Sequence, residues 1–410
     1  MNKEECKHRR SILSNNASVD LIVIGSWPVQ YLNGDVDYKY KQDPNFYYYT
    51  GIKEQDMVLI IERTIGNKYN SYIFARGKDP KQELWTGKRH GLDELMVDYG
   101  FDQAYPLKDV DAYLSSRNYP DILALAHVPD KLCSILPICN NINADMTSLQ
   151  NIMEIQRVVK SPSEITILKK ACAISAQIHN EIGEYISRIN VENEREIDGT
   201  IMGLMIRNGC QRLAYPNVVA AGKNGTTLHY SDNDGEVGNN DLILIDAGGE
   251  LDYYASDITR TIHNSGNFTP EQKNIYDLVL KTQTECINMV KPGITIPDIH
   301  MKSVNIITLG LIELGLLEGN VEDNIHNESY KKFYMHSIGH WMGIDVHDCQ
   351  TVDKATTVLE PGHVFTVEPG IYIPSDDAIP KEYRGIAVRI EDDILVTKDG
   401  YNNMTVLAHK

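Results

Sequence analysis

The sequence predicts a small α/β domain at the N-terminus, followed by a larger α+β domain with duplicated helix-then-strand halves. Strand-like and helix-like runs alternate up to about residue 155. Beyond residue 160, helical patterns precede extended segments, and this order then occurs a second time. With 410 residues, 42% of them hydrophobic, the chain is long enough for two cores. We therefore expect domains at residues 1–155 and 156–410, with a site between the two halves of the second domain.

The first domain is predicted from short apolar runs and from two amphipathic runs. The strand-like runs are Leu21–Gly25, Met57–Glu62, Ser71–Arg76 and Ile122–Ala126, and the helix-like runs are Gly91–Tyr99 and Val110–Ser116. Residues 33–52 are crowded with tyrosines and include Asp35 and Asp37, while residues 84–91 place Trp85 beside basic side chains. From composition alone, both stretches are expected to be packed loops.

The second domain is predicted to open with a long helix. Ser161 and Glu164 match an N-cap and its reciprocal partner, and Pro162 occupies the first helical position. The same signals predict further helices and then extended segments. The helices are expected at residues 195–207, 270–291 and 297–317, and the extended segments at residues 242–246, 256–262, 364–367 and 387–396.

Charge and cysteine content exclude several classes of protein. The chain has 39 basic and 57 acidic residues, a formal net charge of −18, which opposes binding to nucleic acid or to an anionic membrane. No apolar run is long enough to cross a bilayer, and the first residues lack the apolar core of a signal peptide. The seven cysteines are widely spaced, with no Cys-x-x-Cys pair. We expect reduced thiols and a cytoplasmic protein.

Two aspartates mark the first candidate site in the second domain. Asp246 ends the apolar run Leu242–Ile245, where a carboxylate is costly unless it is paired or bound to a cation. Asp257 follows after a turn at Gly248, on the polar face of an alternating segment. A surface hairpin with solvated acids is the alternative for an isolated pair of this kind, but further groups downstream favour a site.

Those further groups are histidines and carboxylates in the last 75 residues or so. His336, His340 and His347 lie close together, and helical spacing would make the first two a metal pair, although nearby glycines favour a loop with a single ligand. Glu368 ends an alternating strand. Arg389, Glu391 and Asp393 are expected on one face of a later strand, and their spacing does not choose between the two acids.

The charges of these groups suit two divalent cations. Four carboxylates, Asp246, Asp257, Glu368 and either Glu391 or Asp393, offset two such ions, and a neutral His340 adds a nitrogen ligand. An oxygen-rich set of this kind favours Mn²⁺, Mg²⁺ or Co²⁺, without excluding Zn²⁺. Two bridged ions would lie roughly 3.5 to 4 Å apart and would lower the pKa of a water held between them.

Taken together, the motifs resemble those of the metal-dependent peptidases of the pita-bread fold, specifically aminopeptidase P. The motifs of the second domain are, in order, DAGGELDYYASDITRT, HSIGHWMGIDVHD, VEPGIY and RIEDD. Those of the first domain are NGDVDYKYKQDPNFYYYTGI and LWTGKRHG. The resemblance covers nearly the whole chain. It implies a pita-bread (creatinase/aminopeptidase-type) catalytic domain after the α/β domain.

The resemblance also implies a role for each matching residue. A dinuclear centre, most often Mn²⁺ in this family and otherwise Co²⁺, Mg²⁺ or Zn²⁺, would be held by Asp246, Asp257, His340, Glu368 and Glu391. This selects Glu391 over Asp393. The catalytic groups would be His229 and His347 on the tetrahedral intermediate, His336 in the same pocket, Glu368 as acid and base, and Arg389 in support. The substrate-binding groups would be Tyr372 in the pocket wall, with Asp35 and Trp85 around the substrate's amino end.

The implied reaction removes the first residue from peptides with proline in second position, by attack of a hydroxide activated by the two metals. A homodimer or homotetramer is expected. The nearest alternative is a prolidase, which acts on Xaa-Pro dipeptides and needs a basic group, such as Arg384 or Arg389, for the substrate carboxylate. A non-catalytic pita-bread interaction protein is a second alternative, and the presence of all five ligand residues argues against it.

Overall fold

The computed structural model describes residues 2–17, 19–64, 66, 68–116, 122–126, 146–189 and 191–410. It divides into two compact units, Met1–Gln156 and Arg157–Lys410, where the sequence predicts a boundary between residues 155 and 156. Cys133 and Cys139 lie outside the described residues, and the other five cysteines are buried thiols. Among the described helices, none has both the length and the apolar character that a membrane span requires.

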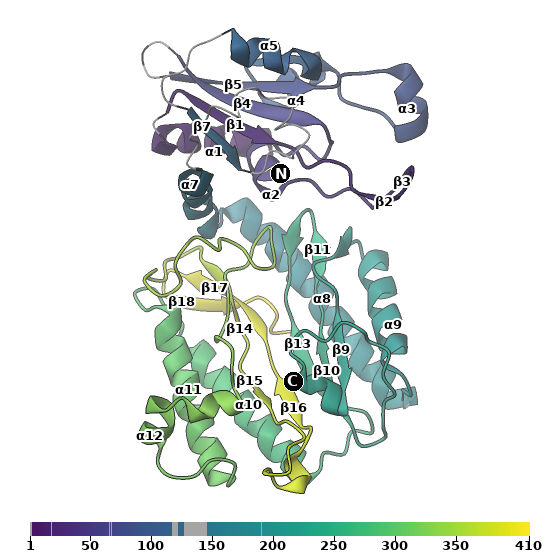
Figure 1. Ribbon diagram of the computed structural model, residues 1–410, viewed down its shortest axis with the longest axis vertical. Coiled ribbons are helices and arrows are strands. Elements are labelled where there is room, and N and C mark those ends of the chain that lie inside the picture. The colour runs from purple at the N-terminus through teal and green to yellow at the C-terminus, as the bar shows by residue number, and fades with distance from the viewer. Residues whose placement is uncertain are drawn as a thin grey trace. The chain divides into compact units, whose positions relative to one another are not determined.

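The first unit is built on a five-stranded sheet in the order β6-β5-β4-β1-β7, of which β5, β4, β1 and β7 are labelled in Figure 1. β1 pairs parallel with β7 and antiparallel with β4, and β5 pairs antiparallel with β4 and parallel with β6. The strands are β1 (Leu21–Gly25), β4 (Met57–Thr64), β5 (Lys68–Ala75), β6 (Gln103–Pro106) and β7 (Ile122–Ala126), with a separate hairpin of β2 (Tyr31–Asn33) and β3 (Val36–Asp37). All of β1 is buried, as its continuous apolar run predicts.

The helices of this part of the chain precede, separate and follow the strands of the sheet. They are α1 (Lys3–Ala17), α2 (Pro44–Thr50), α3 (Pro80–Thr86), α4 (Leu92–Tyr99), η1 (Leu107–Asp109), α5 (Val110–Ser115) and α7 (Met146–Val158). The tyrosine-rich stretch is packed only in part. α2 is buried throughout, and buried Arg9 and Arg10 of α1 donate to the carbonyls of Tyr48 and Tyr49 at 3.1 and 2.8 Å.

The expectation of packed loops is wrong for the rest of these two stretches. Strands β2 and β3 are exposed along their whole length, and Trp85 on α3 is 84% exposed. Composition does not distinguish an aromatic side chain that fills a core from one that projects from a hairpin or a short helix. Both segments lie at the surface of the first unit.

The second unit consists of two halves with the same order of elements. Its helices are α8 (Pro162–Ile189), α9 (Glu194–Arg207), α10 (Pro270–Met289), α11 (Ile296–Glu313) and α12 (Val321–His326), with short turns at η3 (Gly222–Thr226), η4 (Ser329–Lys332) and η5 (Lys381–Tyr383). The reciprocal cap of α8 is confirmed, because the Ser161 amide donates to Glu164 and the Glu164 amide to the Ser161 hydroxyl.

The strands of the second unit show the duplication most clearly. The first half contains β8 (Arg212–Leu213), β9 (Val218–Ala221), β10 (Leu242–Asp246), β11 (Gly249–Leu251), β12 (Tyr254–Ala255) and β13 (Thr259–His263). The second contains β14 (Val364–Val367), β15 (Gly370–Tyr372), β16 (Ala387–Arg389), β17 (Asp392–Thr397) and β18 (Gly400–Asn403). In each half an outgoing strand, β10 or β14, pairs antiparallel with a return strand, β13 or β17.

Each outgoing strand also has a neighbour on its other edge. β9 pairs antiparallel with β10, and residues 338–342 hydrogen-bond to β14 in the second half. Helices α8 and α9 contact the strands of the first half, and α10 contacts those of the second (Figure 1). Ile182, Ile201 and Ile243 belong to the core of the first half, and Ile307 and Val388 to that of the second.

One predicted strand is wrong. Residues 387–396 were expected as a single extended segment, but they form two strands in two sheets, with β16 paired to β15 and β17 paired to β14. The break falls at Ile390 and Glu391, whose amides donate to the carbonyls of Pro369 and Thr259. Because of this break, the polar side chains of β16 and β17 have different neighbours.

Candidate metal centre

The duplication brings four carboxylates to corresponding places in the two halves. Asp246 is the last residue of β10 and Glu368 follows the last residue of β14. Asp257 lies two residues before β13, and Glu391 lies directly before β17. Because each outgoing strand pairs antiparallel with its return strand, the end of one lies beside the start of the other. Each half therefore supplies two carboxylates, one at the end of its outgoing strand and one just before its return strand.

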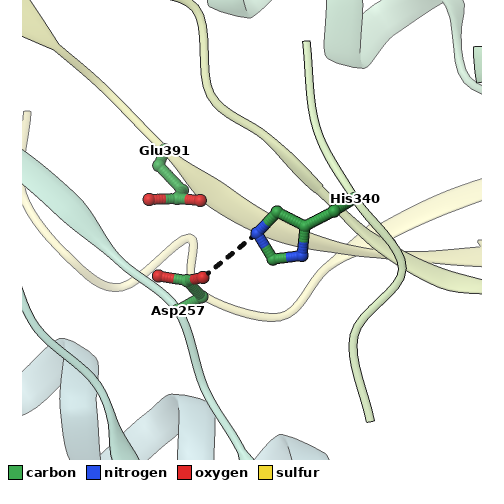
Figure 2. A group of neighbouring side chains, drawn as sticks. All are labelled: Asp257, His340 and Glu391. Carbon is green, nitrogen blue, oxygen red and sulfur yellow. Dashed lines mark ion pairs between the residues drawn. The ribbon is translucent and has the colours of Figure 1, made fainter. Parts of the chain in front are cut away.

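His340 joins this group from the segment that pairs with β14. Its Nδ1 lies 3.1 Å from the carbonyl oxygen of Trp341, and its Nε2 lies 3.4 Å from Asp257 Oδ2 and 3.6 Å from Glu368 Oε1. Figure 2 shows the ring of His340 directed towards Asp257, with Glu391 on the same side. Ligand atoms of Asp257, His340 and Glu391 all lie within 4.8 Å of one another. An imidazole held through Nδ1 presents Nε2 as a metal ligand would.

The electrostatics of Asp257, Glu368 and Glu391 fit a bound cation. Burial first, and then the neighbouring carboxylates, raise the pKa of Glu368 to about 7 and that of Glu391 well above its usual range. The pKa of Asp257 is raised for the same reasons. Burial lowers the pKa of His340, but Asp257 and Glu368 outweigh it and raise this pKa to about 9. The cluster stabilises positive charge, and two divalent ions would offset four carboxylates.

Neutral and cationic side chains hold the carboxylates in place. The Tyr215 hydroxyl lies 2.7 Å from Asp246 Oδ1 and 2.5 Å from Asp257 Oδ1, so it bridges the two acids. Arg389 donates through Nη2 to Asp246 Oδ2 at 2.5 Å, and Thr259 donates to Glu391 Oε2 at 2.7 Å. Sequence reasoning missed Tyr215 and Thr259. Tyr215 lies in no spacing pattern that would distinguish it from other hydroxyl-bearing residues, whereas Thr259 is expected on the same polar face as Asp257, a signal that could have found it.

Periodicity does not choose between Glu391 and Asp393 as the candidate ligand, but their contacts in the structure differ. Glu391 lies with Asp257 and His340, whereas Asp393 is fully buried and accepts hydrogen bonds from the Asp257 amide, at 3.0 Å, and the Cys172 thiol, at 3.3 Å. Asp393 therefore supports the backbone of Asp257 from behind. The break before β17 is the reason that the two acids face different partners.

A cavity of about 1030 Å³ in the second unit opens beside the carboxylates. Its lining includes the four acids together with His229, His336, His340, His347, Tyr372 and Arg389. Residues 333–348 are not helical, which rules out the helical pairing of His336 with His340. His336 Nε2 instead lies 2.9 Å from the Tyr372 hydroxyl, which also accepts a bond from Arg389 at 2.9 Å.

His336 and His347 are neutral at physiological pH. Burial, followed by the nearby Arg389, lowers the pKa of His336 to about 4. Burial, followed by His340 and His229, lowers the pKa of His347 to about 4. The rings of His340 and His347 meet edge to face, with centroids 4.2 Å apart. Neutral imidazoles beside a cationic site can donate a hydrogen bond without adding charge.

Two of the remaining predicted site residues belong to the first unit. Asp35 is in the exposed turn between β2 and β3, and Trp85 is on α3, both in the first unit. Their contact with substrate stays a prediction. Arg384, one candidate for a prolidase-type carboxylate contact, pairs with Asp377 at 2.7 Å and does not line the cavity.

Comparison with known proteins identifies the family of the chain. Residues 166–398 match the family model described as metallopeptidase family M24, and residues 6–121 match the aminopeptidase P N-terminal domain. The Xaa-Pro aminopeptidase of Escherichia coli (strain K12) is 33% identical, over 100% of this chain and 96% of that protein. The Xaa-Pro aminopeptidase of Haemophilus influenzae is 35% identical, with coverages of 100% and 95%.

Solved structures lead to the same family. The structure of aminopeptidase P from E. coli with the inhibitor Pro-Leu superposes with a TM-score of 0.93 at 31% identity, covering 100% of this chain and 96% of that one. The chain therefore belongs to metallopeptidase family M24. It carries the N-terminal domain of aminopeptidase P, and it is a metal-dependent peptidase and hence a hydrolase. The predicted fold class and the resemblance are both confirmed.

Proposed function

We propose that this chain is an Xaa-Pro aminopeptidase that uses two divalent metal ions, with Mn²⁺ first among the candidates. The observation that carries the proposal is the convergence of Asp246, Asp257, His340, Glu368 and Glu391 beside one cavity. Relatives named as Xaa-Pro aminopeptidases match over the full length of the chain. The bond between a first residue and a following proline is therefore the bond that we expect this chain to cleave. Four carboxylates and one imidazole match the charge and ligand preferences of two such ions.

The metals would lower the pKa of a water and polarise the scissile carbonyl. The protein supplies the proton transfers. Glu368, which lines the cavity beside His340, can accept a proton from the attacking water and pass it to the proline nitrogen as the C–N bond breaks.

His347 and His229 are proposed to donate hydrogen bonds to the oxygen that becomes negative during attack. Both line the cavity, and the lowered pKa of His347 keeps its ring neutral with an N–H to donate. Donors fixed in this way are worth roughly 3 to 4 kcal/mol each in enzymes where they have been removed. Arg389 and Tyr372 would keep Asp246 and His336 in position.

Proline in second position explains why a separate peptidase is needed. The bond before proline is a tertiary amide, with no N–H on the proline side and with φ fixed by the ring. Peptidases that bind an extended, hydrogen-bonded backbone handle such a bond poorly. We propose that Asp35 receives the substrate's ammonium group and that Trp85 covers it. We propose that any residue can occupy the first position of the substrate.

The prolidase alternative turns on a cation that can hold a free carboxylate. Arg389 already contacts Asp246, Thr259 and Tyr372. Lys354, whose Nζ donates to the carbonyl of Gly339 at 3.2 Å, also lines the cavity. A dipeptide substrate is therefore an essential arm of the test.

The test measures hydrolysis by metal-stripped protein, with and without added Mn²⁺, of matched Xaa-Pro-Yaa tripeptides, Xaa-Pro dipeptides and Xaa-Ala-Yaa controls. Release of the first residue from the tripeptide alone, only with metal, is the expected result. A preference for the dipeptide would mean a prolidase. No hydrolysis with Mn²⁺, Co²⁺, Mg²⁺ or Zn²⁺ would leave an interaction protein. We also propose a cytoplasmic homodimer or homotetramer, to be checked by light scattering and cell fractionation.

A further inference from the structure

We propose that Glu194, at the start of α9, is a positioning residue that sets the place of His229 over the cavity. The inference rests on the role proposed for His229 in the reaction. Glu194 belongs to no motif of the site and is fully buried. Its importance comes from what its carboxylate holds.

Four hydrogen-bond donors meet on the Glu194 carboxylate, and all four come from residues 221–235. Oε1 accepts from the Ala221 amide at 2.7 Å and from Asn224 Nδ2 at 2.9 Å. Oε2 accepts from the Tyr230 hydroxyl at 2.8 Å and from the Gly235 amide at 2.7 Å. One side chain thus fastens the beginning, the middle and the end of the loop that carries His229.

The backbone of the loop at Gly235 packs directly against the side chain of Glu194. A Cβ on Gly235 would lie 2.6 Å from Asn224 Nδ2 and 2.9 Å from Glu194 Oε2, so a larger residue would displace these two hydrogen-bonded groups. The Glu194 amide also donates to the carbonyl of Gly235 at 3.0 Å. The contact is therefore two-sided, through both backbone and side chain.

His229 depends on this loop for its position. Its side chain is exposed at the cavity lining, and within the described residues no hydrogen bond holds its ring. Leu228 and Tyr230 pack on Val218, Leu244 and Tyr372, which limits the depth of the loop. The amides of Thr227 and Tyr230 make local backbone hydrogen bonds at 3.0 and 3.2 Å, and the directional bonds to Glu194 attach this stretch to α9.

Glu194→Gln is the decisive substitution, because it keeps the shape and no orientation of the amide can satisfy the site. Each carboxylate oxygen accepts from one backbone N–H, that of Ala221 or that of Gly235. Whichever oxygen becomes the NH₂ group, two donors face each other in a buried place. Glu196→Gln is the matched control, since Glu196 is exposed on the same helix.

The kinetic test is a double-mutant cycle with His229→Ala, assayed on a Xaa-Pro-Yaa tripeptide. We expect Glu194→Gln to lower kcat about 10- to 100-fold, the usual effect of a displacement near 1 Å, with KM changed less than about 3-fold. Metal per chain should stay at the wild-type value. In the His229→Ala background the same substitution should lower kcat by less than about 2-fold, because the group it positions is gone.

A measurement without substrate separates this inference from the proposed function. The ring C–H signals of His229, assigned in histidine-labelled protein by their loss in His229→Ala, should shift in Glu194→Gln and stay unchanged in Glu196→Gln. If Glu194→Gln fails to fold, Tyr230→Phe, which removes one donor of four, should show a smaller shift and the same non-additivity.

Three results would overturn the inference: full activity of Glu194→Gln, a decrease of equal size with and without His229, or unshifted ring signals. A wild-type protein that does not cleave the tripeptide would instead remove the proposed function, and the ring signals would then decide alone whether Glu194 positions His229.

Discussion

Asp348 follows the predicted substrate contact His347 and is the centre of a buried ion cluster in the second unit. Its Oδ1 pairs with Arg157 and its Oδ2 with Lys160, and the three side chains are 1%, 3% and 1% exposed, respectively. Arg157 also reaches Asp345 at 3.0 Å, where the acid is 35% exposed. Asp348→Asn keeps the shape of the side chain and removes its charge. The substitution would remove the negative charge that faces both buried cations, Arg157 and Lys160.

The magnitude follows from this burial. Breaking a buried ion pair by neutralising one partner typically costs about 3 to 5 kcal/mol, because an uncompensated charge is left behind. For a unit of this size, each 1 kcal/mol lowers Tm by about 2 to 4 °C, so we expect a decrease of roughly 6 to 20 °C. The control is Asp277→Asn, whose partner Lys273 is 54% exposed. That exposed pair should be worth about 0 to 1 kcal/mol.

The pH dependence has a definite sign. Burial raises the pKa of Asp348, but Arg157 and Lys160 outweigh it and hold this pKa below its usual range. A group with a lowered folded pKa contributes stability above its unfolded pKa, about 3.9, and loses it as pH falls through the folded value. The difference in Tm between wild type and Asp348→Asn should be constant from about pH 5 upwards and narrow below about pH 4.

The assay must follow the second unit alone, since the two units can unfold separately. Of the three tryptophans, Trp341 is buried in the second unit, while Trp27 and Trp85 belong to the first. Fluorescence in a Trp27→Phe, Trp85→Phe background therefore reports on Trp341. A Tm decrease below about 2 °C, or a difference that narrows as pH rises, would refute the reasoning.

Three further predictions concern the site itself. Tyr215→Phe removes the hydroxyl that bridges Asp246 and Asp257, so metal affinity should fall about 10- to 100-fold with the fold intact; unchanged affinity in a metal titration would contradict this. Asp257→Asn should lower bound metal, measured by elemental analysis, and decrease turnover more than about 100-fold, so full activity would remove Asp257 from the centre. Asp35→Ala should raise KM for tripeptides about 10-fold, as expected for a lost contact to an ammonium group worth about 1.4 kcal/mol; an unchanged KM and kcat would exclude Asp35 from the site.

Features that depend on residues close together in the chain, such as helix starts and strand ends, could be predicted from the sequence. The cap at Ser161 and Glu164 depends only on residues three apart, and the predicted helix start was correct. Asp246 and Glu368 were correctly placed at strand ends, because the change from apolar residues to an acid marks where a buried strand ends. The family motifs then supplied the grouping of the five ligand candidates, which spacing alone does not give.

Tertiary structure decided what depends on partners distant in the chain. Glu391 and Asp393 have the same periodicity, and only the break between β16 and β17 directs the first towards His340 and the second towards the Asp257 amide. Tyr215 acquires its importance from two acids 31 and 42 residues away. Trp85 was wrongly expected to be packed, because composition reports that a side chain is apolar and not what covers it. The sequence by itself predicted which groups carry the chemistry, and the packing of the two halves determined which of these groups lie together, because that depends on residues far apart in the chain.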